Sequence, residues 1–228
     1  MTITPLVQVD DGLWCLESHF LVWGCKGSLR MTVIETRVGT VIYSPVKLSP
    51  AHIEQIRRMG RVAAIVAPNL YHHMFLRPCM AAFPEARILI PAGLEAKIGI
   101  VPGAEIMAKD LDLGTSGEIA HHIFVGHKLR ETVLFHRPTG TLVTADLLYN
   151  FQRENFPTEK LFFLLIGSYG APCVTFYHRF AVEDRASVRA LIETVKAWRA
   201  CRIVMSHGRI LAADNAGEIF AGAWARFA

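Results

Sequence analysis

Hydrophobic and polar residues alternate in several parts of the chain, and this alternation predicts β-strands. Three hairpins are expected, over residues 6–20, 31–44 and 132–145. Each is interrupted by a turn signal: Asp10-Asp11-Gly12, Val38-Gly39 and residues 137–140. The strands on either side are rich in β-branched residues, which fit a pleated, half-buried surface.

Apolar runs and amphipathic runs alternate through the rest of the chain. Buried strands are expected at residues 62–66, 86–91 and 202–206, and residues 118–125 are strand-like. Helices are expected at residues 50–60, 71–83, 182–198 and 212–227, the first after the capping signal Ser49-Pro50. Strand runs with interleaved helices predict an α/β (α+β layered) fold, with helices outside layered sheets.

Two stretches show no clear period. Residues 98–113 are expected to form a loop with one short strand. Residues 147–180 are rich in aromatic residues, glycine and proline, and they either cover a site or make a surface excursion.

Composition narrows the class of protein. The chain has 228 residues, 52% hydrophobic and 19% charged, which is enough for one sizeable core and predicts a single domain over residues 1–228. The net charge is +4, but Lys and Arg are scattered, which argues against a nucleic-acid partner. The five cysteines contain no Cys-x-x-Cys pair, so neither a disulfide framework nor a cysteine zinc site is indicated.

The expected location is the cytoplasm, without a membrane partner. Widely spaced cysteines suit a reducing compartment. The first residues show no basic region followed by an apolar core, so no signal peptide is expected. The most apolar window, residues 161–166, is far too short to span a bilayer.

Side chains that can bind a metal follow four of the expected strands. They are His72 and His73, His127, Asp146, and His207. Strand ends on one side of a sheet are close in space, so these residues could converge, and imidazole with carboxylate suits zinc as well as iron or manganese. Each residue also has a structural reading, since a histidine or aspartate often caps a helix or forms a turn.

The order of these motifs resembles the metallo-β-lactamase fold superfamily over nearly the whole chain. The resemblance rests on the histidine-bearing turn after residues 62–66, then Gly126-His127, then Leu142-Val-Thr-Ala-Asp146, then Ser206-His207-Gly208. It implies a four-layer αββα sandwich that holds one or two metal ions. The Asn69-x-x-His72-His73 pattern is similar to a divergent branch of unknown function.

The resemblance also marks a departure from the superfamily pattern His-x-His-x-Asp-His. The last histidine of that pattern falls on His73 and the aspartate on His72, while Pro68 and Leu70 occupy the His-x-His positions and cannot bind a metal. The first metal site would then retain only His127. The second site would be rebuilt from His72, His73, Asp146 and His207.

Several other residues have a functional and a structural reading. Glu131 either orients a metal-bound histidine or is a solvated strand residue. His136 either reaches the site or closes its hairpin, and His121 and His122 should project to opposite faces of a strand. Cys79 is expected to fill the core. Tyr149, Phe151 and Phe156 either line a pocket or belong to the core.

These observations predict a hydrolase-like protein with one divalent metal ion, zinc before iron or manganese. Asp146 would be both a ligand and the catalytic group that orients water, and the substrate would be a small ester, thioester, amide or phosphodiester. The alternative is a non-catalytic protein of the same fold that binds a ligand or partner. Assembly into a homo-oligomer is compatible with either reading.

Overall fold

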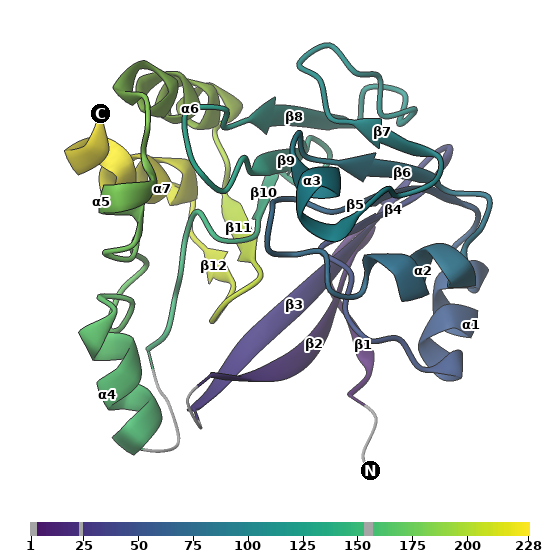
Figure 1. Ribbon diagram of the computed structural model, residues 1–228, viewed down its shortest axis with the longest axis horizontal. Coiled ribbons are helices and arrows are strands. Elements are labelled where there is room, and N and C mark those ends of the chain that lie inside the picture. Colours follow the sequence, from purple (N-terminus) through teal and green to yellow (C-terminus); the bar gives the residue numbers. More distant parts are fainter. Residues whose placement is uncertain (1–3, 23–24, 153–156) are drawn as a thin grey trace.

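The computed structural model describes residues 4–22, 25–152 and 157–228. Two β-sheets lie face to face, and helices cover the outer face of each sheet (Figure 1). This is the αββα sandwich that the sequence predicts.

The larger sheet forms from the first half of the chain. Within the described residues its strands follow chain order: β1 (Leu6–Asp10), β2 (Leu13–Val22), β3 (Cys25–Thr36), β4 (Gly39–Tyr43), β5 (Val62–Val66), β6 (Arg87–Ile90) and β7 (Ala104–Ile106). Strands β1 to β4 are antiparallel, and β4 to β7 are parallel. The predicted hairpins over residues 6–20 and 31–44 are confirmed.

The smaller sheet has the order β12-β11-β10-β9-β8. Its strands are β8 (Ile119–Ile123), β9 (Thr132–His136), β10 (Thr141–Thr144), β11 (Arg202–Met205) and β12 (Leu211–Ala212). Strands β10 and β11 are parallel neighbours, with Thr144 opposite Met205. Their carboxyl ends therefore meet at the same edge, where Asp146 and His207 follow.

Helices pack on both outer faces. The larger sheet is covered by α1 (Pro50–Arg58), α2 (Leu76–Ala82) and α3 (Leu94–Ile98), and the smaller sheet by α6 (Arg185–Trp198), α7 (Ala216–Trp224) and the 3-10 turn η1 (Ala225–Phe227). The Ser49 hydroxyl accepts from the His52 backbone N–H at the start of α1, as its capping signal predicts. Two short helices, α4 (Pro157–Leu165) and α5 (His178–Ala181), lie in the connection before α6.

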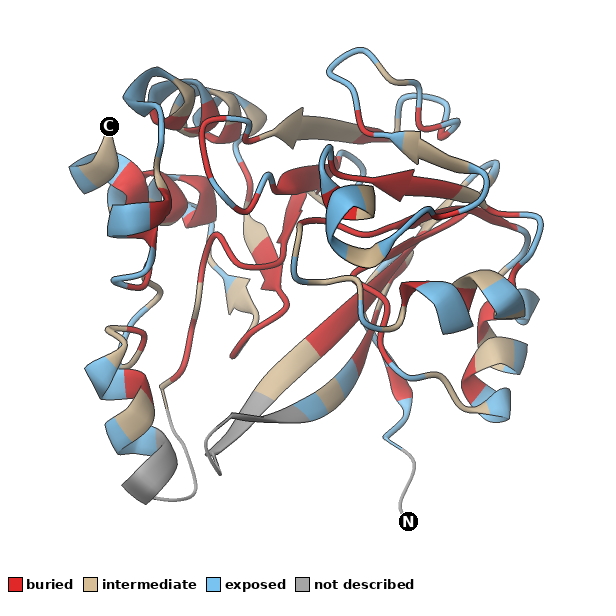
Figure 2. Cartoon of the chain, viewed as in Figure 1, coloured by how far each residue is buried: buried red, intermediate tan, exposed pale blue. Residues whose placement is uncertain are grey.

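Three apolar layers hold the sandwich together. The central layer is made by residues from both sheets, such as Leu13, Val41, Leu134 and Val204, each fully buried. The outer layers fill the space between each sheet and its helices. Buried residues accordingly run along the strands in Figure 2, while the helices are exposed on one side. Burial of these side chains from water is the main stabilising term.

Two predicted helix starts were wrong. The helix expected at residues 71–83 begins at Leu76, because the side-chain oxygen Oδ1 of Asn69 accepts from the backbone N–H groups of Tyr71 and His72 and keeps this segment in a turn. The closing helix expected at residues 212–227 begins at Ala216, after the short strand β12. Within the described residues, no helix is long and apolar enough to cross a bilayer.

Candidate metal centre

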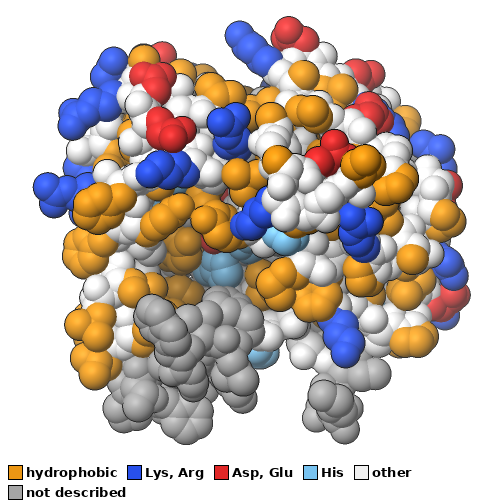
Figure 3. Space-filling view, in the orientation of Figure 1, with side chains coloured by type: hydrophobic (Ala, Val, Ile, Leu, Met, Phe, Trp, Pro, Cys, Tyr) orange, Lys and Arg blue, Asp and Glu red, His pale blue; other side chains and the backbone are white. Residues whose placement is uncertain are grey.

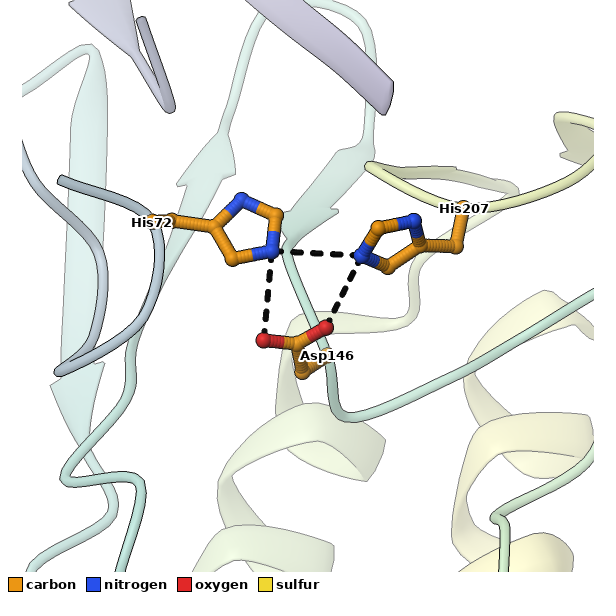
Figure 4. Close-up of side chains that lie close together, drawn as sticks. All are labelled: His72, Asp146 and His207. Carbon is orange, nitrogen blue, oxygen red and sulfur yellow. Dashed lines mark hydrogen bonds and ion pairs between the residues drawn. The ribbon is translucent and has the colours of Figure 1, made fainter. Parts of the chain in front are cut away.

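Three of the predicted ligands meet at one edge of the sandwich. His72 Nε2 lies 3.2 Å from Asp146 Oδ2, and His207 Nε2 lies 3.0 Å from Asp146 Oδ1. The two Nε2 atoms are 3.2 Å apart (Figure 4). The ligand atoms of the three residues all lie within 4.8 Å of one another, close enough to share a metal ion.

The strand order explains this convergence. His72 lies in the turn after β5, Asp146 follows β10 and His207 follows β11. The three side chains are only 7% to 9% exposed, so they lie beneath the protein surface at this edge of the sandwich. Figure 4 shows both imidazole rings directing one nitrogen toward the carboxylate between them.

The structure does not bring His73 and His127, the other two predicted ligands, into this group. His73 is half-buried, and burial followed by the charge of Lys97 lowers its pKa. His127 is fully buried and its Nε2 lies 3.0 Å from Nδ1 of His178. His178 comes from residues 147–180, where no clear period is present, so no local pattern indicated this pairing.

Hydrogen bonds on the far side of each ring fix where the protons lie. His207 Nδ1 is 2.6 Å from the carbonyl oxygen of Ser28, which can only accept, so this nitrogen carries a proton. In the neutral ring, Nε2 then presents a lone pair to Asp146. A lone pair facing a carboxylate oxygen at 3.0 Å is repulsive unless a cation or a proton lies between them.

The same reasoning applies to His72 through a chain of hydroxyl groups. Its Nδ1 lies 2.7 Å from Ser44 Oγ, Ser44 Oγ lies 3.2 Å from Ser206 Oγ, and Ser206 Oγ lies 3.1 Å from the Arg30 carbonyl. When Ser206 donates to that carbonyl, Ser44 donates to Ser206 and accepts from Nδ1 of His72. Nε2 of His72 is then free to act as a ligand. Three electron-pair donors therefore face one point.

The pKa shifts agree with this electron-rich centre. Burial opposes charge on Asp146, but the neighbouring His72 and His207 rings hold the pKa of its carboxyl well below the ordinary value. Burial likewise opposes charge on His72, but Asp146 prevails and raises the pKa of that ring. Without a metal ion, a proton taken up by His72 supplies the positive charge that the three donors need.

Glu131 and Asn69 form hydrogen bonds that position the residues of the metal centre. Glu131 is fully buried and accepts from the Asn69 amide, the Thr144 hydroxyl and the backbone N–H groups of Ala145 and Asp146, at 2.6 to 2.9 Å. The solvated alternative for this residue is wrong. The pKa of Glu131 is raised above its ordinary value, because burial and the Asp146 carboxylate outweigh the opposing effect of these hydrogen bonds.

Asn69 joins two parts of the centre. Its side-chain Nδ2 group donates to Glu131 and to Asp146 Oδ2, both at 2.8 Å, while its side-chain oxygen Oδ1 accepts from the His72 N–H in the turn that carries this histidine. Such partners orient ligand side chains and tune their affinity for a metal. The sequence placed Asn69 in the turn, but the contact with Asp146 depends on strands far apart along the chain.

Arg30 holds the segment that carries His207. Its guanidinium group is buried and donates to the carbonyl oxygens of Met205 and Gly208, on either side of that histidine, at 2.5 and 2.8 Å. The Gly208 N–H donates to Ser28 Oγ at 2.6 Å. Ser44 has a φ of 57°, a costly conformation for serine that directs its hydroxyl to His72.

The other candidates have structural roles. His136 is buried and bonds Thr139 within its hairpin. His121 contacts the Ala108 carbonyl, whereas His122 contacts Thr194 of α6. Cys79 is core filler, and burial raises its pKa to about 12. Phe151 is buried against Phe163, and Phe156 lies outside the described residues.

The centre opens into a pocket of about 380 Å³. His72, Asp146 and His207 form its base, and its walls include Leu29, Leu129 and Tyr177. The Tyr149 ring stacks on His207 at 5.5 Å between centroids, and its hydroxyl donates to Asp146 Oδ1 at 3.0 Å. Figure 3 shows histidine side chains at the base of a hollow bordered mainly by hydrophobic residues.

Comparison with known proteins gives the fold. No protein-family model and no curated protein sequence matches the chain. Solved structures match nearly its full length. They include the DIM-1 metallo-β-lactamase (TM-score 0.67, 12% identity, 98% of this chain and 97% of that one) and the mono-zinc form of the FIM-1 metallo-β-lactamase from Pseudomonas aeruginosa (0.64, 13%, 97% and 95%).

A third match is a putative diflavin flavoprotein from a Nostoc species, with a TM-score of 0.67, 11% identity and coverage of 98% of this chain and 97% of that fragment. Identities this low establish architecture alone. The two face-to-face sheets, their flanking helices and these matches together show that the protein has the metallo-β-lactamase fold.

Proposed function

We propose that the protein is a mononuclear metal-dependent hydrolase whose metal is held by His72, Asp146 and His207. The observation that carries the proposal is the convergence of two imidazole nitrogens and a carboxylate at the base of a pocket. Three protein ligands with one position left open are typical of catalytic zinc sites. Two nitrogen donors and one oxygen donor suit zinc, and also iron or manganese.

A divalent ion at this point, when bound, supplies a Lewis acid and lowers the pKa of a water molecule. The chain's own residues then have separate tasks. Asp146 is held by hydrogen bonds from Asn69 and Tyr149, so its two oxygens have fixed directions. The hydrophobic walls lower the local dielectric constant, which strengthens electrostatic interactions at the base.

A single metal ion fits the structure better than two. Pro68 and Leu70 offer no ligand atoms where the superfamily pattern has histidines, and His127 is engaged with His178. FIM-1 is described in a mono-zinc form, so this fold is compatible with one ion.

Metal analysis of protein purified without chelators tests the proposal. We expect about one equivalent of zinc, iron or manganese per chain, and loss of that metal in His72→Ala and His207→Ala. His73→Ala should keep the metal, which distinguishes the three-residue centre from a four-ligand site. A metal content below a tenth of an equivalent, with no uptake on titration, would contradict the proposal.

The alternative is a non-catalytic protein that binds a ligand at the same place, and Pro68 and Leu70 favour it. A panel of ester, thioester, amide and phosphodiester substrates separates the two. Turnover that depends on added metal and disappears in His207→Ala supports the hydrolase. Metal binding without turnover of any member supports the alternative.

A further inference from the structure

The part of the pocket above the centre is almost entirely apolar. Beyond the three residues at its base, the described lining consists of leucine, proline, methionine, phenylalanine and tyrosine side chains. None of the described lining residues is a lysine or an arginine, although such side chains reach the outer rim in Figure 3. An anionic group enclosed in this upper part of the pocket, away from the metal centre, would have no lysine or arginine among the described lining residues to pair with, which is costly.

The ammonium group of Lys97, close to the pocket-lining residue Tyr71, is engaged in other contacts. Lys97 Nζ donates to the Leu70 carbonyl at 2.7 Å and lies 3.8 Å from the centre of the Tyr71 ring. Lys97 itself does not line the pocket, and these contacts hold its charge against the ring of a residue that does. Lys97 is therefore unavailable to a carboxylate or phosphate inside.

Exposed apolar side chains extend the pocket outward. Tyr71 is 52% exposed, Met74 is 66% exposed and Tyr177 is 43% exposed, and all three line the mouth. Burial and the neighbouring Tyr71 hydroxyl raise the pKa of Tyr177 to about 12, so this phenol stays neutral. Clustered exposed apolar residues around a cavity are typical of a site that binds an apolar ligand.

We infer that the substrate is an uncharged carboxylic ester or thioester whose apolar acyl group occupies this pocket. The inference rests on the proposed function and narrows it to acyl substrates whose acyl group carries no charge. About 380 Å³ holds roughly a dozen non-hydrogen atoms at ~30 Å³ each, enough for a short or medium acyl chain. In the reaction, oxygen of water bonds to the acyl carbon, the acyl C–O or C–S bond breaks, and the departing alcohol or thiol takes a proton.

Matched pairs of small molecules test the inference. The first pair is hexanamide and the monoamide of adipic acid, which differ by one terminal carboxylate. Hexanamide should raise the unfolding temperature of the metal-free protein, and the adipic monoamide should not. The second pair is para-nitrophenyl pentanoate and the mono-para-nitrophenyl ester of glutaric acid. The metal-loaded protein should hydrolyse the pentanoate at least tenfold faster.

Met74→Lys places a cation at the mouth of the pocket, at a position exposed enough to accept it without loss of folding. This variant should reduce the preference for the uncharged ester at least fivefold. Val38→Lys is the control, because Val38 is 46% exposed in the turn between β3 and β4 and does not line the pocket.

The outcomes separate the two proposals. Equal binding or equal hydrolysis of the carboxylate-bearing probes by the unchanged protein would overturn the inference and leave the hydrolase proposal standing. Absence of turnover of every ester, thioester, amide and phosphodiester, with hexanamide still stabilising the protein, would overturn the hydrolase proposal while supporting an uncharged, apolar occupant. Turnover of amides or phosphodiesters without turnover of esters or thioesters would overturn the inference alone. Failure of hexanamide to stabilise the protein would overturn the inference.

Discussion

Two pairs of histidines lie near the same edge of the sandwich and have opposite surroundings. The rings of His72 and His207 are 5.1 Å apart between centroids, and those of His127 and His178 are 4.9 Å apart. The first pair shares a carboxylate and borders a pocket. The second pair has no carboxylate between its rings and packs against Phe124 and Trp224.

The difference lies in the hydrogen bonds of each ring. Nδ1 of His127 accepts from the Leu129 N–H, so Nε2 carries the proton and donates to Nδ1 of His178. This pair uses its lone pairs internally, whereas His72 and His207 are both held from behind and direct Nε2 to a common point. The comparison shows that the hydrogen-bond partners of an imidazole ring decide whether one of its nitrogens is available to a metal ion.

The largest expected effect is on metal affinity, which should depend on the first histidine pair and not on the second. His207→Ala removes a ligand atom and should lower metal affinity more than 100-fold, beyond the loss typical of an outer partner. His127→Gln should change metal affinity less than twofold, because the His127 ring is hydrogen-bonded to His178 and does not belong to the group of converging ligand atoms. Calorimetric titration with zinc measures both, and a large loss in His127→Gln would show that the second pair also serves the metal.

Ser44 should have an intermediate effect. Ser44→Gly removes the hydroxyl that orients His72 while glycine tolerates the φ of 57°, so metal affinity should fall about 10- to 100-fold. Ser116→Gly is a matched control, because Ser116 also has a positive φ, of 51°, and is exposed. Equal affinities in the two variants would mean that the Ser44 hydroxyl does not position the ring.

The pH dependence of stability should distinguish the pairs in metal-free protein. Burial, followed by the charge of His178, lowers the pKa of His127 to about 3, below its unfolded value near 6.5. Between these values the unfolded chain binds more protons, so His127 makes the protein less stable as pH falls, by about 1 kcal/mol per pH unit. His127→Gln should therefore lose less stability than the unchanged protein between pH 6.5 and 4.5 in urea unfolding.

His72 should have the opposite sign. Asp146 overcomes burial and raises its pKa above the unfolded value, so its contribution to stability is present at low pH and disappears as pH rises through the folded pKa. Metal-free His72→Gln should consequently lose more stability on acidification than the unchanged protein. The same slope in the His72 and His127 variants would remove the electrostatic distinction between the pairs.

The smallest effect concerns the packing of the second pair. His178→Leu should lower the free energy of unfolding by about 1–3 kcal/mol, because it removes the acceptor for the buried His127 N–H. Metal content should stay unchanged. A loss of metal at full stability would instead connect His178 to the centre.

Much of the architecture followed from local patterns. Turn signals such as Asp10-Asp11-Gly12 and the capping signal at Ser49-Pro50 lie where the structure has hairpins and a helix start, because their causes are contained within a few residues. The stretch 147–180 could not be assigned, since its short helices lack a period and depend on contacts with the rest of the fold.

The sequence by itself determined that His72, Asp146 and His207 follow strands, and strand ends on one side of a sheet meet. Only the tertiary structure decided which imidazoles face one another. His72 and His73 are neighbours in one turn, but the Asn69 hydrogen bonds orient that turn so that the first ring reaches Asp146. His127 and Glu131 likewise acquired their roles from partners distant in the chain, which no local pattern encodes.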